Sequence, residues 1–263
     1  MTLAAGKPSR WNVRSVAALF GAALLVIALL GAALFGLAFS GSDALQSPGG
    51  FDREPIHRPA SLPASAVAQL ARSLEASSGH PAHLWRDTPP VNADGSVNGY
   101  IEIPRGGRDK WEFDMGTNAR ALDRIIPAAI GGYPVNYGFV PQTVSYDGDP
   151  FDVLVLGPPL PGGALVRGVA VGVMFMADEK GPDSKIVISP VDRQGRPLYE
   201  LTAERQGEIG DYFARYKSGQ AGTFSTVDGW GSRRGGLAFI ATTHAFFRDC
   251  QQARQATPCT ARP

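Results

Sequence analysis

The chain has few of the residues that build zinc or redox sites. It contains two cysteines, Cys250 and Cys259, and four histidines among 263 residues. Both cysteines lie near the C-terminus, where their spacing fits neither a zinc ribbon nor a CxxC redox pair. A disulfide between them would require an oxidising compartment, and two unpaired thiols are the alternative. The cysteines therefore do not point to the main chemistry of the protein.

The chain also lacks a charge imbalance and several common catalytic signatures. Its formal net charge is +1, which argues against a protein that binds nucleic acid by bulk electrostatics. We find no HExxH motif, no Walker glycine-lysine loop and no GxSxG elbow. The 32 glycines and 21 prolines instead favour a loop-rich β architecture over a helical bundle.

One long apolar segment near the N-terminus has no charged residue. It covers residues 16–39 and exceeds the ~20 residues that span a bilayer. Lys7, Arg10 and Arg14 precede it, and Asp43 is the first charged residue after it. The positive-inside rule then places the N-terminus in the cytoplasm. The sequence therefore predicts an uncleaved transmembrane anchor.

The anchor determines the expected organisation of the rest of the chain. We interpret residues 1–15 as a cytoplasmic tail and 40–83 as a linker with one short helix at Ala64–Ala76 and a solvent-facing His83. Residues 84–263 form the expected catalytic domain. This domain would lie in the periplasm or another extracytoplasmic space, held at the cytoplasmic (inner) membrane through residues 16–39. The alternative is a signal sequence, with secretion after cleavage.

Strand patterns dominate the expected domain. They cover Tyr100–Pro104, Lys110–Phe113, Phe151–Leu156, Ala164–Met176 and Lys185–Ser189. Helical patterns follow at Ala203–Arg215 and at about Gly236–Ala256. A run of strands followed by helices predicts an α+β fold with a closed or strongly curved sheet.

Carboxylates gather in two short segments beside these strands. Asp147, Asp149 and Asp152 stand within six residues, and Asp178 and Asp183 belong to a second acidic cluster with Glu179. Like charges repel one another unless a cation neutralises them. Ligands that are all oxygen favour a hard cation such as Mg²⁺ over zinc, and carboxylate-bound Mg²⁺ usually keeps positions open for phosphate oxygens. The sequence therefore predicts a metal-dependent enzyme that acts on phosphates.

The spacing of these carboxylates suggests individual roles. Asp147 and Asp152 flank a turn and can converge on one ion, which Asp183 could also bind from a neighbouring hairpin. Asp149, between them, is the candidate to orient or deprotonate a water. Groups suited to a doubly anionic substrate recur at the strand edges: Lys110, Arg124, Tyr137, Lys185, Tyr216 and Lys217. An isolated D-G-D-P would usually be a surface turn, but this one is not isolated.

An ordered set of motifs between Gly99 and Trp230 resembles one known family. The motifs are IEIP, KWEFD, YPVNYGF, DGDPFDVLVL, MADEKGPDSK and RYK. Together they resemble the soluble-type (family I) inorganic pyrophosphatases. The resemblance implies hydrolysis of inorganic pyrophosphate to two orthophosphates with several Mg²⁺ ions per site. It also implies a five-stranded OB-like β-barrel with flanking helices, which agrees with the number of predicted strands, and a homo-oligomer.

The resemblance also assigns roles to matching positions, none of which is substituted here. Asp147, Asp152 and Asp183 match ligands of the activating Mg²⁺ ions, and Asp178 and Glu102 match ligands of further ions. Asp149 matches the general base. The residues that match phosphate-holding groups are Lys110, Arg124, Tyr137, Lys185, Tyr216 and Lys217. Glu112 matches an acidic member of the pocket, and its role stays open.

Three functional hypotheses follow. The first is a membrane-tethered, Mg²⁺-dependent inorganic pyrophosphatase. The second keeps the site but changes the substrate to another phosphoanhydride, such as polyphosphate or a nucleotide. The third is a non-catalytic, membrane-tethered module that binds phosphate. Retention of Asp149 and of all five metal-ligand positions favours an enzyme, and the absence of an obvious base-stacking platform favours pyrophosphate over nucleotides.

Overall fold

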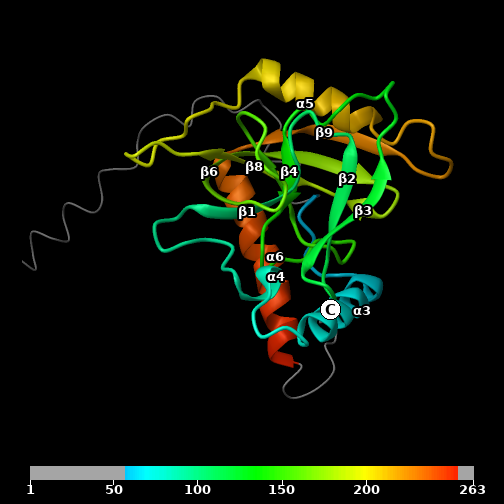
Figure 1. Ribbon diagram of the computed structural model, residues 1–263, viewed down its shortest axis with the longest axis vertical. Helices are drawn as coiled ribbons and strands as arrows, with labels where there is room; N and C mark the ends of the chain where they lie inside the picture. Colours follow the sequence, from blue (N-terminus) through cyan, green and yellow to red (C-terminus); the bar gives the residue numbers. More distant parts are fainter. Residues whose placement is uncertain (1–56, 254–263) are drawn as a thin grey trace, which may run out of the picture. The chain divides into compact units, whose positions relative to one another are not determined.

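The computed structural model describes residues 57–253, which all belong to one compact unit (Figure 1). The predicted cytoplasmic tail, the anchor at 16–39, the first part of the linker and Cys259 lie outside the described residues. Among the helices of residues 57–253, none combines the length and apolar character that crossing a membrane requires.

Five strands form a ring at the centre of the unit. They are β1 (Val97–Ile103), β4 (Asn136–Phe139), β5 (Asp152–Val155), β8 (Lys185–Pro190) and β6 (Leu165–Asp178). Each strand pairs with the next in this order, and β6 also pairs with β1, so that the ring closes. Only the β5–β8 pairing within the ring is parallel, which makes the sheet mixed. Closure leaves these five strands without an unpaired edge.

Among the described residues, four further strands lie outside the ring. β7 (Gly181–Pro182) and β9 (Ser225–Gly231) both pair with β6. β2 (Asp109–Asp114) and β3 (Ala119–Ile125) form a separate hairpin. The predicted strand at Lys110–Phe113 is therefore real but lies outside the ring, and β4 takes the fifth place. Most side chains of the hairpin are exposed or half-buried, whereas β4 is almost wholly buried.

Two long helices follow the strands, as the sequence predicts. α5 covers Ala203–Arg215, and Thr202 caps it by accepting a hydrogen bond from the Arg205 backbone N–H. α6 covers Arg233–Ala253, and its side chains Phe239 and Ile240 pack into the apolar interior of the ring. Because their buried faces repeat at helical spacing, both helices were visible in the sequence.

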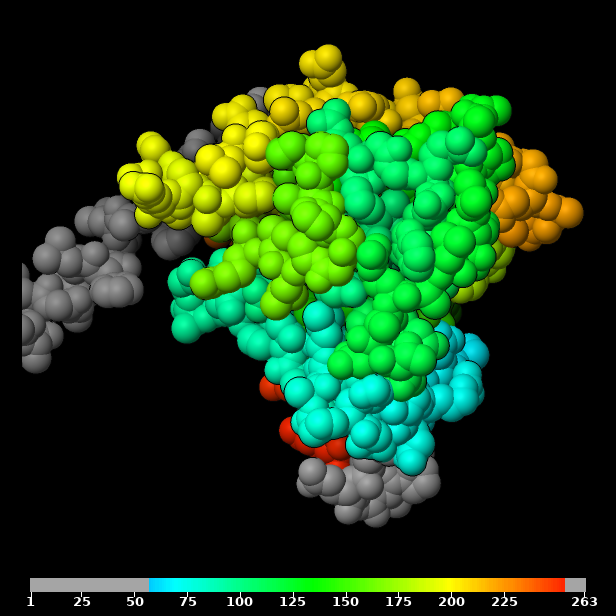
Figure 2. Space-filling model, viewed as in Figure 1, coloured from blue at the N-terminus to red at the C-terminus, as the bar shows by residue number. Residues whose placement is uncertain are grey.

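The first described helix lies within the segment predicted as linker. α3 covers Ala64–Ser77, as expected for a helix, but it packs on the domain with α4 (Leu84–Asp87). Leu70 and Leu74 of α3 are fully buried in an apolar cluster with Phe139 of β4 and Phe247 of α6. Figures 1 and 2 show α3 and α4 together at one end of the unit, next to α6. The folded unit therefore includes this helix, because its apolar face is needed to cover the end of the ring.

His83 was expected to face solvent from the linker, and this expectation is wrong. Its side chain is buried, with Nδ1 accepting a hydrogen bond from the Arg86 backbone N–H and Nε2 lying 3.0 Å from the Met115 carbonyl oxygen. The His83 imidazole also packs edge-on against the phenyl group of Phe113. Burial lowers the pKa of His83 below its ordinary value, which favours the neutral imidazole.

Candidate active site

A polar cavity of about 670 Å³ opens between the end of the strand ring, the β2–β3 hairpin and α3. The sequence-predicted site residues that line it are Glu102, Lys110, Glu112, Arg124, Tyr137, Asp147, Asp149, Asp152, Asp178, Asp183, Tyr216 and Lys217. Lys185, the remaining predicted residue, pairs directly with two of these carboxylates. The structure therefore brings all thirteen residues to one place from segments that are far apart in sequence.

The turn between β4 and β5 presents three of the carboxylates to the cavity. Asp147 Oδ1 accepts a hydrogen bond from the Asp149 backbone N–H at 3.1 Å, which fixes the turn locally. Gly148 has a φ of +95°, and a Cβ atom at this position would lie 2.9 Å from the Cβ of Gln69. A glycine is therefore needed both for the backbone conformation and for the close contact with α3.

Lys185 lies buried between two predicted metal ligands. β5 and β8 run parallel with Val153 opposite Ile186, so Asp152 and Lys185 stand at neighbouring strand starts. Lys185 Nζ pairs with Asp152 and lies 2.8 Å from Asp183 Oδ1. Burial acts to lower the pKa of Lys185, but the two carboxylates outweigh it and hold the pKa above its ordinary value. The lysine is therefore a permanent positive charge beneath the cavity.

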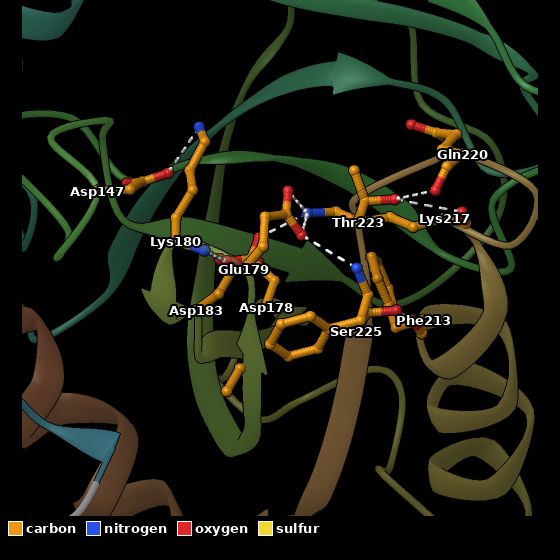
Figure 3. Close-up of polar contacts among 12 residues, drawn as sticks. Asp147, Asp178, Glu179, Lys180, Asp183, Phe213, Lys217, Gln220, Thr223 and Ser225 are labelled. Carbon is orange, nitrogen blue, oxygen red and sulfur yellow. Dashed lines mark hydrogen bonds and ion pairs between the residues drawn. The ribbon is translucent and has the colours of Figure 1, made fainter.

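Two further lysines connect the acidic segment at the end of β6 with its neighbours (Figure 3). Lys217 Nζ lies 2.7 Å from Asp178 Oδ2 and 2.8 Å from Glu179 Oε1. Lys180 Nζ lies 3.5 Å from Asp147 Oδ2. In Figure 3 the Lys180 side chain extends toward Asp147, while the Lys217 amine lies beside the Glu179 carboxylate. These contacts pair cations and carboxylates across three segments of chain.

The hairpin contributes another mixed group of charges. Lys110 and Arg124 face each other across β2 and β3. Lys110 Nζ pairs with Glu112 and lies 3.2 Å from Asp123 Oδ2, which is 3.1 Å from Arg124 Nη1. The Nε atom of Arg124 is buried without a hydrogen-bond partner among the described residues. The hairpin thus presents cationic donors to the cavity. Glu112, whose role the sequence left open, is an ion-pair partner of Lys110.

Several acids in the cavity are poorly solvated and repel one another. Burial, with repulsion from Asp152 and Glu112, raises the pKa of Glu102 to about 8, although Glu102 accepts a hydrogen bond from the Phe113 N–H. Desolvation in the cavity and the neighbouring Asp147 raise the pKa of Asp149 to about 7, while 53% of its side chain stays exposed. Burial is therefore the main reason that the charged forms of these two acids are disfavoured, and the neighbouring carboxylates add to it.

This donor set fits a hard divalent cation. Every candidate ligand is a carboxylate oxygen, and no cysteine or histidine lines the cavity. A divalent cation would favour the charged forms of these acids, which burial and the neighbouring carboxylates disfavour. Within residues 57–253, no three acidic or histidine side chains converge closely enough to form a ready metal site, because lysines stand between the carboxylates.

Two tyrosines, the partly buried Tyr137 and the buried Tyr216, complete the cavity wall. Burial raises the pKa values of Tyr137 and Tyr216 well above the ordinary value, so both phenols stay neutral and can donate hydrogen bonds. Lys185 Nζ lies 5.8 Å from the centre of the Tyr137 ring. Neutral phenols and fixed lysines are suited to holding phosphate oxygens.

Sequence reasoning gave no role to four residues whose side chains contact the predicted site residues. Glu179 was part of the acidic cluster but received no role, and Lys180 follows it in the same motif. Asp123 stands beside Arg124 and gives no periodic signal. Gln69 had no signal at all, because an amide on a helix expected in a linker is an ordinary surface residue.

Comparisons with known proteins agree with this geometry. The family model for inorganic pyrophosphatase matches residues 99–248. The inorganic pyrophosphatase of Caulobacter vibrioides is 38% identical over 149 residues, covering 53% of this chain and 83% of the relative. That of Sulfolobus acidocaldarius is 35% identical over 152 residues, covering 55% of this chain and 87% of the relative.

Solved structures show the same similarity. The inorganic pyrophosphatase from Thermus thermophilus is 34% identical, with a TM-score of 0.58, and covers 64% of this chain and 99% of its own. That from Coxiella burnetii is also 34% identical, with a TM-score of 0.57, and covers 61% of this chain and 99% of its own. This chain therefore contains the whole fold of these proteins together with additional residues.

Proposed function

The chain belongs to the inorganic pyrophosphatase family, and from this premise we propose how its residues carry out the reaction. It hydrolyses inorganic pyrophosphate to two orthophosphates. The observation that carries this conclusion is the single cavity in which the Asp147–Asp152 turn meets four lysines and two arginines. No observation on the site favours polyphosphate, a nucleotide or a non-catalytic role.

Asp149 is the general base in this proposal. Its carboxylate is open to the cavity and has a pKa of about 7, so it can accept a proton from the attacking water near neutral pH. The water oxygen forms a bond to one phosphorus while the bridging P–O bond breaks, and the second phosphate leaves with the bridging oxygen. Lys110, Arg124, Lys185 and Lys217 hold the phosphate oxygens, with the phenols of Tyr137 and Tyr216 donating further hydrogen bonds.

Mg²⁺ is the metal that we propose for this site. Asp147, Asp152 and Asp183 would hold the activating ions, and Asp178 and Glu102 would hold further ions. Bound Mg²⁺ supplies charge neutralisation on the phosphate oxygens and a lowered proton affinity of a coordinated water. The lysines that now bridge these carboxylates have three donors each and can also contact phosphate oxygens.

The test of this function is phosphate release by the purified full chain. Pyrophosphate, tripolyphosphate and ATP are supplied separately, each with Mg²⁺ and with a chelator. We expect fast release from pyrophosphate with Mg²⁺, and little from the chelated sample or from the two longer substrates. Equal rates on tripolyphosphate or ATP would contradict the assigned substrate, and a rate that is insensitive to chelation would contradict the metal requirement.

We also propose that residues 16–39 anchor the enzyme in the cytoplasmic membrane with the catalytic domain outside. The apolar run and the preceding basic residues support this topology. Cys250 on α6 is buried, and a disulfide between Cys250 and Cys259 would require an oxidising compartment. Activity should stay with membranes after an alkaline wash, and protease added to intact spheroplasts should cut the domain. Activity inside the spheroplasts would contradict the topology, and soluble periplasmic activity would favour the cleaved signal sequence.

Two finer expectations stay predictions. The OB-like character of the five-stranded ring is supported by the closure of its pairings. The homo-oligomer is supported by two exposed apolar side chains on the hairpin, Leu122 and Ile125. Light scattering on the purified chain measures the oligomer directly, and a monomer mass at micromolar concentration would contradict it.

A further inference from the structure

One wall of the cavity comes from outside the family segment. The family match begins at residue 99, whereas α3 ends at Ser77. Four residues of α3 nevertheless line the cavity: Gln69, Arg72, Ser73 and Ala76. They stand at i, i+3, i+4 and i+7, so they share one face of the helix. The neighbouring face carries the buried leucines. α3 is therefore amphipathic: one face packs in the apolar core, and the other lines the cavity.

The contact of this wall with the reaction centre is direct. Gln69 Nε2 donates a hydrogen bond to Asp149 Oδ1 at 2.5 Å. The other carboxylate oxygen of Asp149, Oδ2, lies 3.8 Å from Lys180 Nζ. Gln69 therefore makes the shorter of the two side-chain contacts that hold this carboxylate.

α3 can act in this way because its position on the turn is fixed. Ala66 and Leu70 are completely buried. A Cβ atom on Gly148 would lie 3.1 Å from the Ala66 Cα and 2.9 Å from the Gln69 Cβ, so the helix and the turn are in close contact. A shift of α3 along the turn would break both the apolar packing and the contact with Asp149.

We propose that Gln69 is a positioning residue for Asp149, supplied by a helix that lies outside the family segment. The terminal torsion of an aspartate side chain is broad, so an isolated carboxylate on an exposed turn has no single orientation. The Gln69 amide removes this freedom before substrate binds, and proton transfer from the attacking water then starts from a fixed geometry. The inference rests on the proposed role of Asp149 as the general base.

A double-mutant cycle on the full chain tests this inference. The four proteins are the parent, Gln69→Met, Asp149→Asn and the double variant, and kcat and KM for pyrophosphate are measured at saturating Mg²⁺. Methionine keeps the length of the side chain but has no N–H donor. Ser65→Ala is the matched control, because Ser65 is exposed on α3 and does not line the cavity. We expect Gln69→Met to lower kcat about tenfold with KM unchanged, and Ser65→Ala to match the parent.

The decisive result is the effect of Gln69→Met in the Asp149→Asn background. If Gln69 acts through Asp149, the tenfold loss disappears in that background. A loss of equal size in both backgrounds would mean a general structural effect and would overturn the inference. Parental kcat for Gln69→Met with a slow Asp149→Asn protein would also overturn it while leaving the proposed function intact. Parental kcat for Asp149→Asn would contradict the base assignment itself.

Discussion

The cavity has two walls that differ in chemistry and in the part of the chain that provides them. The strand wall consists of Glu102, Asp152 and Asp183 at the end of the ring, with Lys185 behind them. The helix wall consists of the cavity face of α3, which includes Gln69. The strand wall consists of buried and half-buried charged side chains, whereas the side chains of the helix wall are half-buried or exposed. The difference shows that one catalytic cavity can combine a family segment with an element outside it.

The two walls should also respond differently to substitution. Removing a charge from the strand wall leaves another buried charge unpaired, which is costly. When a polar group is removed from the helix wall, water can replace it as the partner of the remaining group. The free energy of unfolding then changes little, and the main effect is on the geometry of the site. The contrast separates residues whose loss destabilises the fold from residues whose loss changes mainly the geometry of the site.

The largest expected effect on stability is that of Lys185→Met. Lys185 is 2% exposed, and its loss leaves Asp152 and Asp183 facing each other without their shared cation. We expect the free energy of unfolding to fall by about 3–5 kcal/mol. Urea unfolding of the full chain without Mg²⁺, followed by tryptophan fluorescence, measures this change.

Lys180→Met is the matched control for that experiment. Lys180 also bridges two carboxylates, Asp147 and Asp149, but it is 57% exposed. We expect this variant to lose only about 0–1 kcal/mol, because water screens exposed ion pairs. Equal losses for the two lysines would contradict the assignment of Lys185 as a buried structural charge.

Leu70→Ala tests whether the helix wall is held by the apolar core. Leu70 is completely buried in the cluster with Phe139 and Phe247. We expect a loss of about 3 kcal/mol in the free energy of unfolding, from reduced burial and the cavity that remains. The control is Leu198→Ala, because Leu198 is 53% exposed. If both variants have the stability of the parent, α3 does not belong to the cooperative unit.

The smallest expected effect is a pH dependence of the free energy of unfolding that comes from His83, the residue before α4. Its pKa is lower in the folded chain because of burial, so the unfolded chain takes up the proton first as the pH falls. The stabilisation is therefore present above about pH 6.5 and decreases as the pH drops toward the lowered folded value. His83→Gln should reduce this slope between pH 7 and pH 5 in urea unfolding. An unchanged slope would contradict the buried neutral state of His83.

The strand wall could be predicted from the sequence because its residues are unusual for their positions. Carboxylates next to apolar strands are costly, so Asp152 and Asp183 stood out without any knowledge of the fold. The partners in the ring were harder to predict. Lys110–Phe113 has a clear strand pattern but forms the hairpin, whereas Asn136–Phe139 is short and contains a glycine, and it completes the ring.

The helix wall could not be predicted for a different physical reason. The apolar spacing of Val67, Leu70 and Leu74 indicated a helix correctly. It did not indicate what the helix packs against, because tertiary contacts between distant segments leave no local pattern. Gln69 reaches Asp149 across 80 positions of sequence, and a glutamine on a helix surface is an ordinary choice.

The most direct test of the account is the Asp149→Asn variant, because Gln69 of the helix wall and Lys180, just after β6, both contact this carboxylate. Asparagine keeps the size of the side chain but accepts a proton poorly. The measurement pairs kcat for Mg²⁺-dependent hydrolysis of pyrophosphate with Mg²⁺ affinity from calorimetry. The account predicts that kcat falls by about 10²–10⁴-fold, while Mg²⁺ affinity stays at the parental value. A parental kcat, or a loss of activity that follows a loss of Mg²⁺ binding, would contradict it.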